Sequence, residues 1–357
     1  MSNQDVGTPV FYINELSWLK STGHDITIEP MYWDEVIGNP EVLLDLNPSN
    51  GIELQPELGS TTNLYINITS NDYQFSPGPS GHKYFLAILG HSAASCPTTF
   101  FFKEGEDQNT ITLSTNNVVN CVPMNHIFVK PSHNGFSIGT IWPFPTTNIF
   151  SIGTYPSDTG GYAGSLHIGS IALGQYYEMP HSPDLNLTMT RRMDSVKTQD
   201  TLGGGKLFDY TYSSPPRWQN NLAPWEMAGI NFSTQEAKSP LSRKGTRQWD
   251  LSFSYLKDVD VLGVNQSASH FYDIESGYDS GINSSNEFIH DITDDNSFIS
   301  KVIAKTHGGT LPFIFQPDKN NANIDQFAIC KLDMNSIKIE QVASGMYNMK
   351  LKIREVW

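Results

Sequence analysis

The stretch Lys83-Tyr-Phe-Leu-Ala-Ile-Leu89 is a continuous apolar run that lies between glycines. Such a short apolar run is typical of a β-strand that is buried on both faces. Asn63–Thr69 before it and Ile111–Ser114 after it instead alternate apolar and polar residues, the period of a half-buried strand. Turn signals such as Pro77-Gly78-Pro79 separate these runs. Short strands between frequent turns predict a β-sandwich or jelly roll over residues 51–182.

A second β-rich region begins after the two prolines of Met179-Pro-His-Ser-Pro183. Five stretches in this region alternate with period two: Asn186–Thr190, Phe208–Tyr212, Trp249–Tyr255, Phe327–Leu332 and Tyr347–Ile353. The chain is therefore predicted to be mainly β.

One helix is predicted within the second region. Asp295 or Asn296 can cap its start, and Gly308-Gly309 can end it. Its apolar stripe consists of Phe298, Ile299, Val302 and Ile303. The N-terminal residues 1–50 are predicted to form an arm, with a short helix around Asn14–Lys20 and a strand at Asp25–Glu29.

The charge is unevenly distributed along the 357 residues, which carry a formal net charge of −15. Residues 1–50 carry about −7 and residues 255–300 about −8. We interpret residues 263–294 as an acidic insertion in a third segment that spans residues 183–357. Two interpretations of the acidic segments stay open: solvated loops, or surfaces that face a basic patch on a neighbouring copy.

The composition excludes several classes of protein. The chain has 22 Lys and Arg against 37 Asp and Glu. Because proteins bind nucleic acid mainly by neutralising its phosphates with Lys and Arg, nucleic acid is not expected to be a partner. No stretch approaches the roughly 20 apolar residues that span a bilayer, so no membrane insertion is expected. The N-terminus lacks the basic and apolar regions of a signal peptide. Cys96, Cys121 and Cys330 are widely spaced and are interpreted as small apolar residues.

Two short motifs resemble catalytic or phosphate-binding signatures. Gly135-Phe-Ser137-Ile-Gly139 matches a nucleophile elbow, but Pro143 and Pro145 prevent the helix that must follow the serine. Gly203-Gly-Gly-Lys206 lacks the spacing of a phosphate loop and is interpreted as a turn. We therefore expect no enzyme activity, no cofactor and no metal site.

The aromatic residues of the first β region offer a candidate ligand face. Trp142, Phe144, Tyr155 and Tyr162 could stack against a sugar, or they could pack in the interior. The sequence leaves both interpretations open.

Several motifs from residue 185 to the C-terminus occur in a fixed order. They are Arg192, Thr201-Leu-Gly-Gly-Gly205, Arg247-Gln-Trp-Asp-Leu-Ser-Phe-Ser254, the predicted helix, Gly308-Gly-Thr-Leu-Pro-Phe-Ile-Phe-Gln-Pro-Asp318, a strand at Phe327-Ala-Ile-Cys-Lys331 and a closing strand that ends at Glu355. This order resembles the tailed-phage minor tail protein family. The acidic insertion departs from the family pattern.

A second resemblance covers residues 60–180. Lys83-Tyr-Phe-Leu-Ala-Ile-Leu-Gly-His-Ser92 and Leu166-His-Ile-Gly-Ser-Ile-Ala-Leu-Gly174 are similar to the galactose-binding-like jelly rolls of phage tail-tip proteins. The two resemblances imply a virion structural protein of the distal tail protein kind. The C-terminal segment would be a tail-tube-like β domain with one short helix.

The resemblance implies a homo-oligomeric ring, a hexamer or a trimer, that joins the tail tube to hub, baseplate or tail-fibre proteins. DNA would only pass through its lumen. The residues that we expect to form the scaffold or the interface are Trp249, Gly308, Gly309, Pro312, Phe313 and Phe315. The alternative function is a host-surface adhesin whose jelly roll binds glycan.

Overall fold

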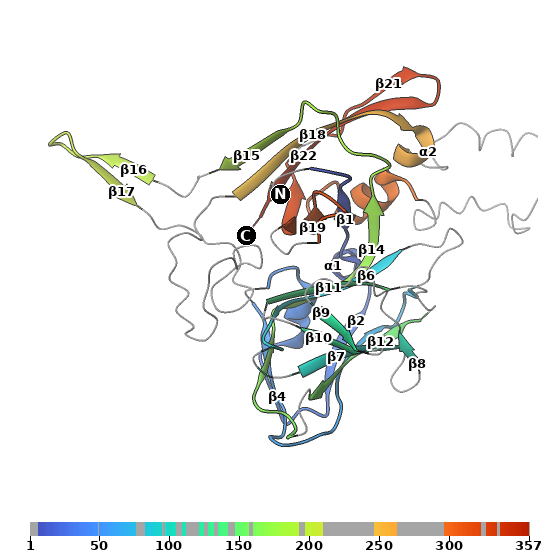
Figure 1. The fold of residues 1–357 in the computed structure, drawn as a ribbon, viewed down its shortest axis with the longest axis vertical. Helices are drawn as coiled ribbons and strands as arrows, with labels where there is room; N and C mark the ends of the chain where they lie inside the picture. The colour runs from blue at the N-terminus through green and yellow to red at the C-terminus, as the bar shows by residue number, and fades with distance from the viewer. Residues whose placement is uncertain are drawn as a thin grey trace, which may run out of the picture.

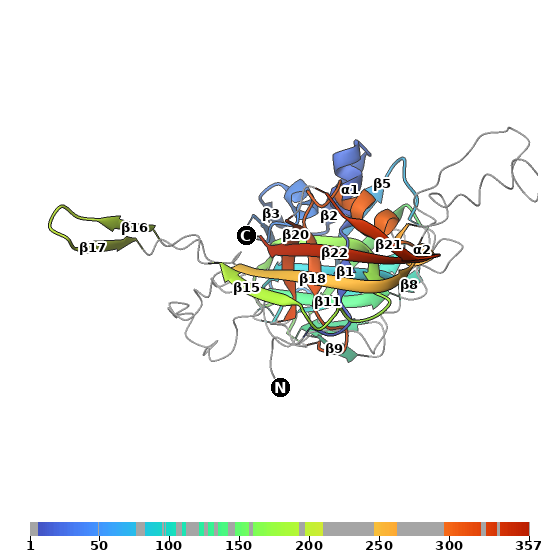
Figure 2. The same ribbon diagram turned by 90° about the horizontal axis from the view of Figure 1, so that it is seen from above.

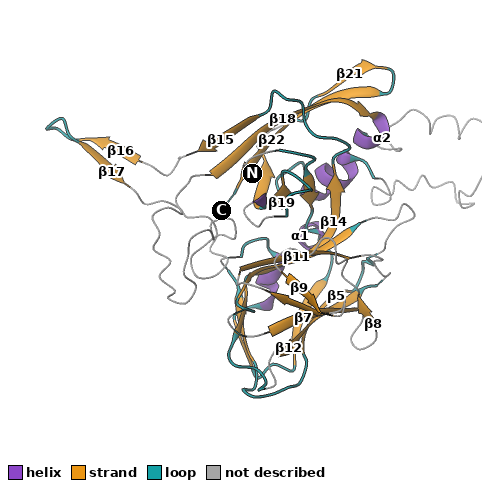
Figure 3. Cartoon of the chain, in the orientation of Figure 1, coloured by secondary structure: helices purple, strands orange, loops and turns teal. Residues whose placement is uncertain are grey.

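The computed structural model describes residues 6–48, 50–75, 83–94, 96, 98–104, 109–111, 121–124, 128–131, 135–141, 147–156, 160–192, 197–209, 246–262, 296–322, 326–333 and 336–356. The predicted mainly β fold is confirmed, since antiparallel strands make up about half of the described residues (51%) and helices 12% (Figure 3). Within these residues no helix has the length and the apolar character needed to cross a bilayer.

The larger of the two main sheets draws its strands from all parts of the chain. In spatial order they are β11 (Gly135–Ile141), β6 (Tyr84–His91), β14 (Ser170–Glu178), β1 (Val10–Tyr12), β19 (Phe313–Gln316), β20 (Ala328–Leu332), β22 (Met346–Glu355), β18 (Thr246–Lys257) and β15 (Thr188–Arg192), with β21 (Ile339–Ala343) paired to β22.

The second main sheet comes from the first half of the chain. Its order is β2 (Ile26–Met31), β5 (Leu64–Ser70), β12 (Ile149–Pro156), β7 (Thr98–Glu104), β10 (Phe128–Pro131) and β9 (Cys121–Met124), with β8 (Asn109–Ile111) paired to β7. The described residues also form two small sheets: β13 (Leu166–Ile168), β4 (Ile52–Gln55) and β3 (Glu35–Ile37), and the hairpin β16 (Lys197–Asp200) and β17 (Lys206–Asp209). The helical segments are α1 (Glu15–Thr22), η1 (Pro40–Leu44), α2 (Asp258–Val261), η6 (Ile299–Ile303) and η7 (Ala304–Thr306).

Strand β1 lies at the centre of the larger sheet (Figure 1). Phe11 pairs with Tyr177 of β14 on one side and with Phe315 of β19 on the other. The Tyr12 hydroxyl donates to Gln316 Oε1 over 2.8 Å. Sheet pairing therefore runs across the predicted boundaries near residues 50 and 182, although the three-segment division itself stays a prediction.

Strand β6 is buried along its whole length, as its apolar run predicted. Tyr84, Leu86 and Ile88 face the core between the two main sheets, where Ile66 of β5 and Ile152 of β12 meet them. The alternate residues, Phe85, Ala87 and Leu89, face a second cluster that includes Ile314 and Ile329. Since both faces are covered, every position of the strand can be apolar.

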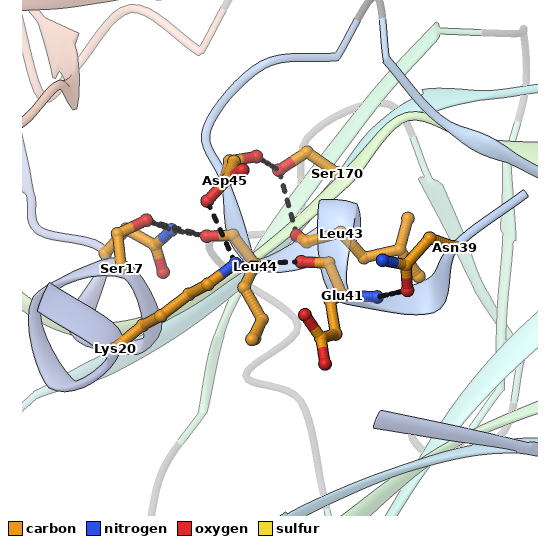
Figure 4. Close-up of polar contacts among 9 residues, drawn as sticks. Ser17, Lys20, Asn39, Glu41, Leu43, Leu44, Asp45 and Ser170 are labelled. Carbon is orange, nitrogen blue, oxygen red and sulfur yellow. Dashed lines mark hydrogen bonds and ion pairs between the residues drawn. The ribbon is translucent and has the colours of Figure 1, made fainter. Parts of the chain in front are cut away.

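Polar side chains of α1 and β14 bond to backbone carbonyls in and just after η1 (Figure 4). Ser17 Oγ of α1 donates to the Leu44 carbonyl over 2.7 Å, and Ser170 Oγ of β14 donates to the Asp45 carbonyl over 2.6 Å. Asn39 Oδ1 accepts from the Glu41 amide and caps η1. These contacts fix η1 between α1 and β14.

The predicted helix of the second region is shorter than expected, and its turns are not α-helical. It consists of the π-type turn η6 followed by the 3₁₀ turn η7. Asn296 is not the residue that caps it, because Ser297 Oγ accepts from the Ser300 amide, and Asp295 lies outside the described residues. The predicted end is confirmed, since the helical run stops at Thr306 and is followed by left-handed backbone at Gly308 and Gly309.

Of the predicted stripe, Phe298 and Val302 are buried, while Ile299 and Ile303 are only half-buried. Polar side chains are buried on the same segment. Lys305 Nζ bonds to Glu15 of α1, and Lys301 Nζ bonds to Gln175 of β14. The segment therefore connects the C-terminal strands to the N-terminal helix through buried polar contacts that apolar periodicity does not reveal.

Candidate functional site

Three of the predicted scaffold residues lie in the interior of this chain. Trp249, Phe313 and Phe315 are at most 1% exposed. Phe315 meets the Trp249 ring edge-on at 5.1 Å between centroids, and Phe11 of β1 lies 5.6 Å from Phe313. These side chains therefore stabilise the interior of the chain and are not on its surface.

The remaining predicted scaffold residues shape the turn before β19. Gly308 and Gly309 have φ values of 71° and 90°, which favour glycine. A Cβ on Gly309 would lie 2.5 Å from the Cβ of Leu332, so glycine also permits close packing there. Pro312 is half-buried.

The acidic residue that ends the closing strand has a buried partner. Glu355 Oε2 accepts from Arg247 Nε over 3.2 Å and from the Arg247 amide over 2.8 Å. A second guanidinium nitrogen donates to the Phe327 carbonyl, and the guanidinium carbon lies 5.2 Å from the centre of the Trp249 ring. In the sequence both residues stand out only as parts of separate motifs, because their contact requires the pairing of β18 with β22.

The strongest candidates for contact with other proteins lie at one end of the larger sheet. Strand β15 is the last strand in the order of the larger sheet and pairs with β18 among the described strands. Leu185, just before this strand, is fully exposed. The terminal strand of a sheet is a position at which a further chain can add a strand.

The β16–β17 hairpin stands away from the body in two perpendicular views (Figures 1 and 2). Gly203 to Lys206 lies at its turn, as predicted, and Thr201 Oγ1 accepts from the Gly205 amide there. Leu202 and Leu207 are 111% and 59% exposed. The hairpin therefore presents apolar side chains to solvent.

The four predicted glycan-facing residues do not gather at one described site. Trp142 and Phe144 lie outside the described residues. Tyr162 is buried, and its hydroxyl donates to the Thr154 carbonyl over 2.9 Å; this burial raises the pKa of Tyr162 to about 12. Tyr155 is 45% exposed on β12.

Ser137 lies beside a histidine that is 46 residues away in the sequence. Ser137 Oγ lies 2.8 Å from His91 Nε2, because β11 and β6 are paired. Both side chains are buried, and Ser137 lies within β11 rather than on a turn before a helix. The pair is therefore a polar contact inside the sheet and lacks the exposed geometry of a nucleophile elbow.

The described cysteines occupy apolar or half-buried positions. Cys330 lies in the core, where burial and then Glu355 raise the pKa of its thiol well above the usual value. Cys96 is half-buried and its thiol donates to the Ser165 carbonyl. The side chain of Cys121 lies outside the described residues. Across the described part of the chain, no group of His, Cys, Asp and Glu has the arrangement of a metal site.

Comparisons with protein-family models, with curated proteins and with solved structures find no match to this chain.

Proposed function

We propose that this chain is a structural subunit of a long-tailed phage tail tip, of the distal tail protein kind. It forms a ring that connects the tail tube to the hub and the receptor-binding apparatus. The motif order of the C-terminal half supports this proposal through its resemblance to minor tail proteins. Its partners are further copies of itself, the tail tube protein and hub or tail-fibre proteins in the virion.

The observation that carries the proposal is the projecting β16–β17 hairpin with its exposed Leu202 and Leu207. A two-stranded hairpin is marginally stable by itself in water, so it gains stability when a further surface covers it. Strand β15, the last strand of the larger sheet, precedes this hairpin along the chain. A neighbouring copy can cover both features, and identical contacts repeated around an axis close a ring of six or three subunits.

The test is the mass of the full chain in solution by light scattering, with negative-stain images of the same fraction. We expect rings from the native chain and a shift to monomers for Leu202→Asp combined with Leu207→Asp. Charging these side chains does not affect the core, since both face solvent. Leu58→Asp is the matched control, because Leu58 is 72% exposed on a different part of the molecule. A native chain that stays monomeric, or a hairpin variant that still forms rings, contradicts the proposal.

A further inference from the structure

The C-terminal strands of the larger sheet have one buried side and one polar side. Leu251 of β18 and Leu351 of β22 lie in the core. Side chains alternate along a strand, so Lys350, Lys352 and Arg354 of β22 project to the opposite side. Lys350 is exposed, and the side chains of Lys352 and Arg354 are 43% and 39% exposed. Three consecutive outward positions of one strand are therefore cationic and accessible to solvent.

Neighbouring strands extend this cationic side. Lys331 of β20 lies directly opposite Arg354, and Arg192 of β15 lies opposite Thr246 of β18. Thr246 shares the outward side because the next residue, Arg247, is buried. Figure 2 shows β15, β18 and β22 side by side. We call the following residues the basic face: Arg192, Lys331, Lys350, Lys352 and Arg354.

The carboxylates on this side of the sheet do not neutralise the basic face. Asp333 lies 3.6 Å from Lys352 Nζ and 3.7 Å from a guanidinium nitrogen of Arg354. Asp250 of β18 lies opposite Lys352. Five cations and two carboxylates leave a net charge of +3 on this side, although the whole chain carries −15.

The like charges of the basic face weaken the sheet that carries them. Lys331 and Arg354 lie directly opposite one another, a position at which like charges are destabilising. Glu340 of β21 lies near Lys350, but its pKa is lowered first by Lys338, with which it pairs, and less by Lys350. Sheet stability therefore does not explain why cations gather here, whereas contact with carboxylates of a partner does.

The N-terminal part of the chain carries the complementary charge. Residues 21–82 contain nine carboxylates and no Lys or Arg. Eight of the nine are exposed, and Glu53 is half-buried. Glu29 lies on β2, Glu35 on β3 and Glu53 on β4. We call the nine residues the acidic surface: Asp25, Glu29, Asp34, Glu35, Glu41, Asp45, Glu53, Glu57 and Asp72.

The basic face and the acidic surface of one copy lie apart. Figure 1 places β18 and β22 at the top of the molecule and β2 and β4 in its lower half. We propose that the basic face of each copy binds the acidic surface of a second copy. This inference rests on the proposed function, and it adds a polar contact to the apolar contact of the β16–β17 hairpin. A contact between two different surfaces continues from copy to copy and closes a ring when the rotation fits.

Nucleic acid fits the basic face less well than carboxylates do. A DNA duplex carries one negative charge about every 1.7 Å and is bound through several cations that contact its phosphates. Asp333 already pairs with two of the five cations, and Asp250 lies on the same side of the sheet. The net charge of −15 on the whole chain also repels a long polyanion. Separate carboxylates on a folded surface can instead lie opposite individual cations.

The experiment measures self-association of the full chain by sedimentation equilibrium in about 0.05 M and about 1 M NaCl. The native chain should associate at least about tenfold more weakly at high salt, because the Debye length is then only about 3 Å. Lys331→Glu combined with Lys350→Glu, the basic-face variant, should weaken association at low salt by at least about tenfold. Asp34→Lys combined with Glu35→Lys, the acidic-surface variant, should have the same effect. An equimolar mixture of the two variants should associate again, since each brings one unchanged surface, and misfolding would not produce this recovery.

The matched control is Lys83→Glu combined with Lys319→Glu. It changes the net charge by the same amount as the basic-face variant, and both lysines are exposed away from the basic face, just before β6 and after β19. This control should associate as the native chain does. A short fluorescent DNA duplex, followed by anisotropy, tests nucleic acid as the ligand. Duplex binding that only the basic-face variant loses, while its association is unchanged, overturns the inference.

The inference and the proposed ring fail on different results. A basic-face variant that still forms native rings overturns the inference and leaves the ring in place, as does an equal loss of association in the lysine control or a mixture that does not recover. If the native chain forms only a salt-sensitive dimer, which the basic-face substitutions dissociate, the inference holds and the ring is contradicted. A native chain that is monomeric at low salt contradicts both.

Discussion

Removal of the Glu355 carboxylate should be among the most destabilising single changes in the C-terminal strands. Glu355 is 1% exposed and accepts from Arg247 Nε over 3.2 Å. At this distance and an effective dielectric constant of about 20, the attraction between the two charges is about 5 kcal/mol. Much of this attraction offsets the cost of taking both charges out of water. The loss is largest when one partner remains alone.

We therefore expect Glu355→Ala to lower the free energy of unfolding by about 3–5 kcal/mol. Glu355→Gln should lose less, about 1–3 kcal/mol, because its amide oxygen can still accept from the Arg247 amide. Replacing both partners, with Arg247→Met and Glu355→Leu together, should recover most of the loss, since no buried charge then lacks a partner.

The assay is urea unfolding of the full chain, followed by the fluorescence of the tryptophans, with free energies compared at constant m-value. Glu178→Gln is the matched control. Glu178 pairs with Lys83 at a similar 3.3 Å, but the two side chains are 31% and 55% exposed. An exposed pair contributes less than about 1 kcal/mol. A loss below about 1 kcal/mol in Glu355→Ala, or a double variant no more stable than Glu355→Ala, would refute the reasoning.

Two further predictions concern the same core. Phe313→Ala should destabilise the chain by about 3–5 kcal/mol in the same urea assay, because Phe313 is fully buried against Phe11; a loss under about 1 kcal/mol would contradict this. Iodoacetamide at about pH 8 should leave Cys330 unmodified in the folded chain and modify it in urea, as peptide mass spectrometry can determine. Burial keeps the pKa of this thiol well above the usual value, so the reactive thiolate is scarce until the chain unfolds, and rapid modification of the folded chain would argue against this burial.

Residues that are near one another in sequence account for the correct predictions about the fold. Period-two alternation located β5, β18 and β22, and the glycines after η7 located the end of the helical run, because strand and turn preferences depend on neighbouring residues. The apolar run of β6 showed burial on both faces for the same reason. The π and 3₁₀ turns of η6 and η7 were not predictable from neighbouring residues. Ser297, Lys301 and Lys305 are polar, and only their partners on distant segments explain their burial.

The sequence by itself therefore determined that this protein is mainly β and that segments such as β5, β6, β18 and β22 are strands. Only the tertiary structure decided that β1 joins β14 to β19, that the core clusters form around these strands, that Phe313 and Phe315 lie inside it, and that Glu355 meets Arg247. The physical reason is that alternation fixes which side of its own strand a residue occupies. Which strand lies beside it, and in which register, depends on contacts between segments hundreds of residues apart.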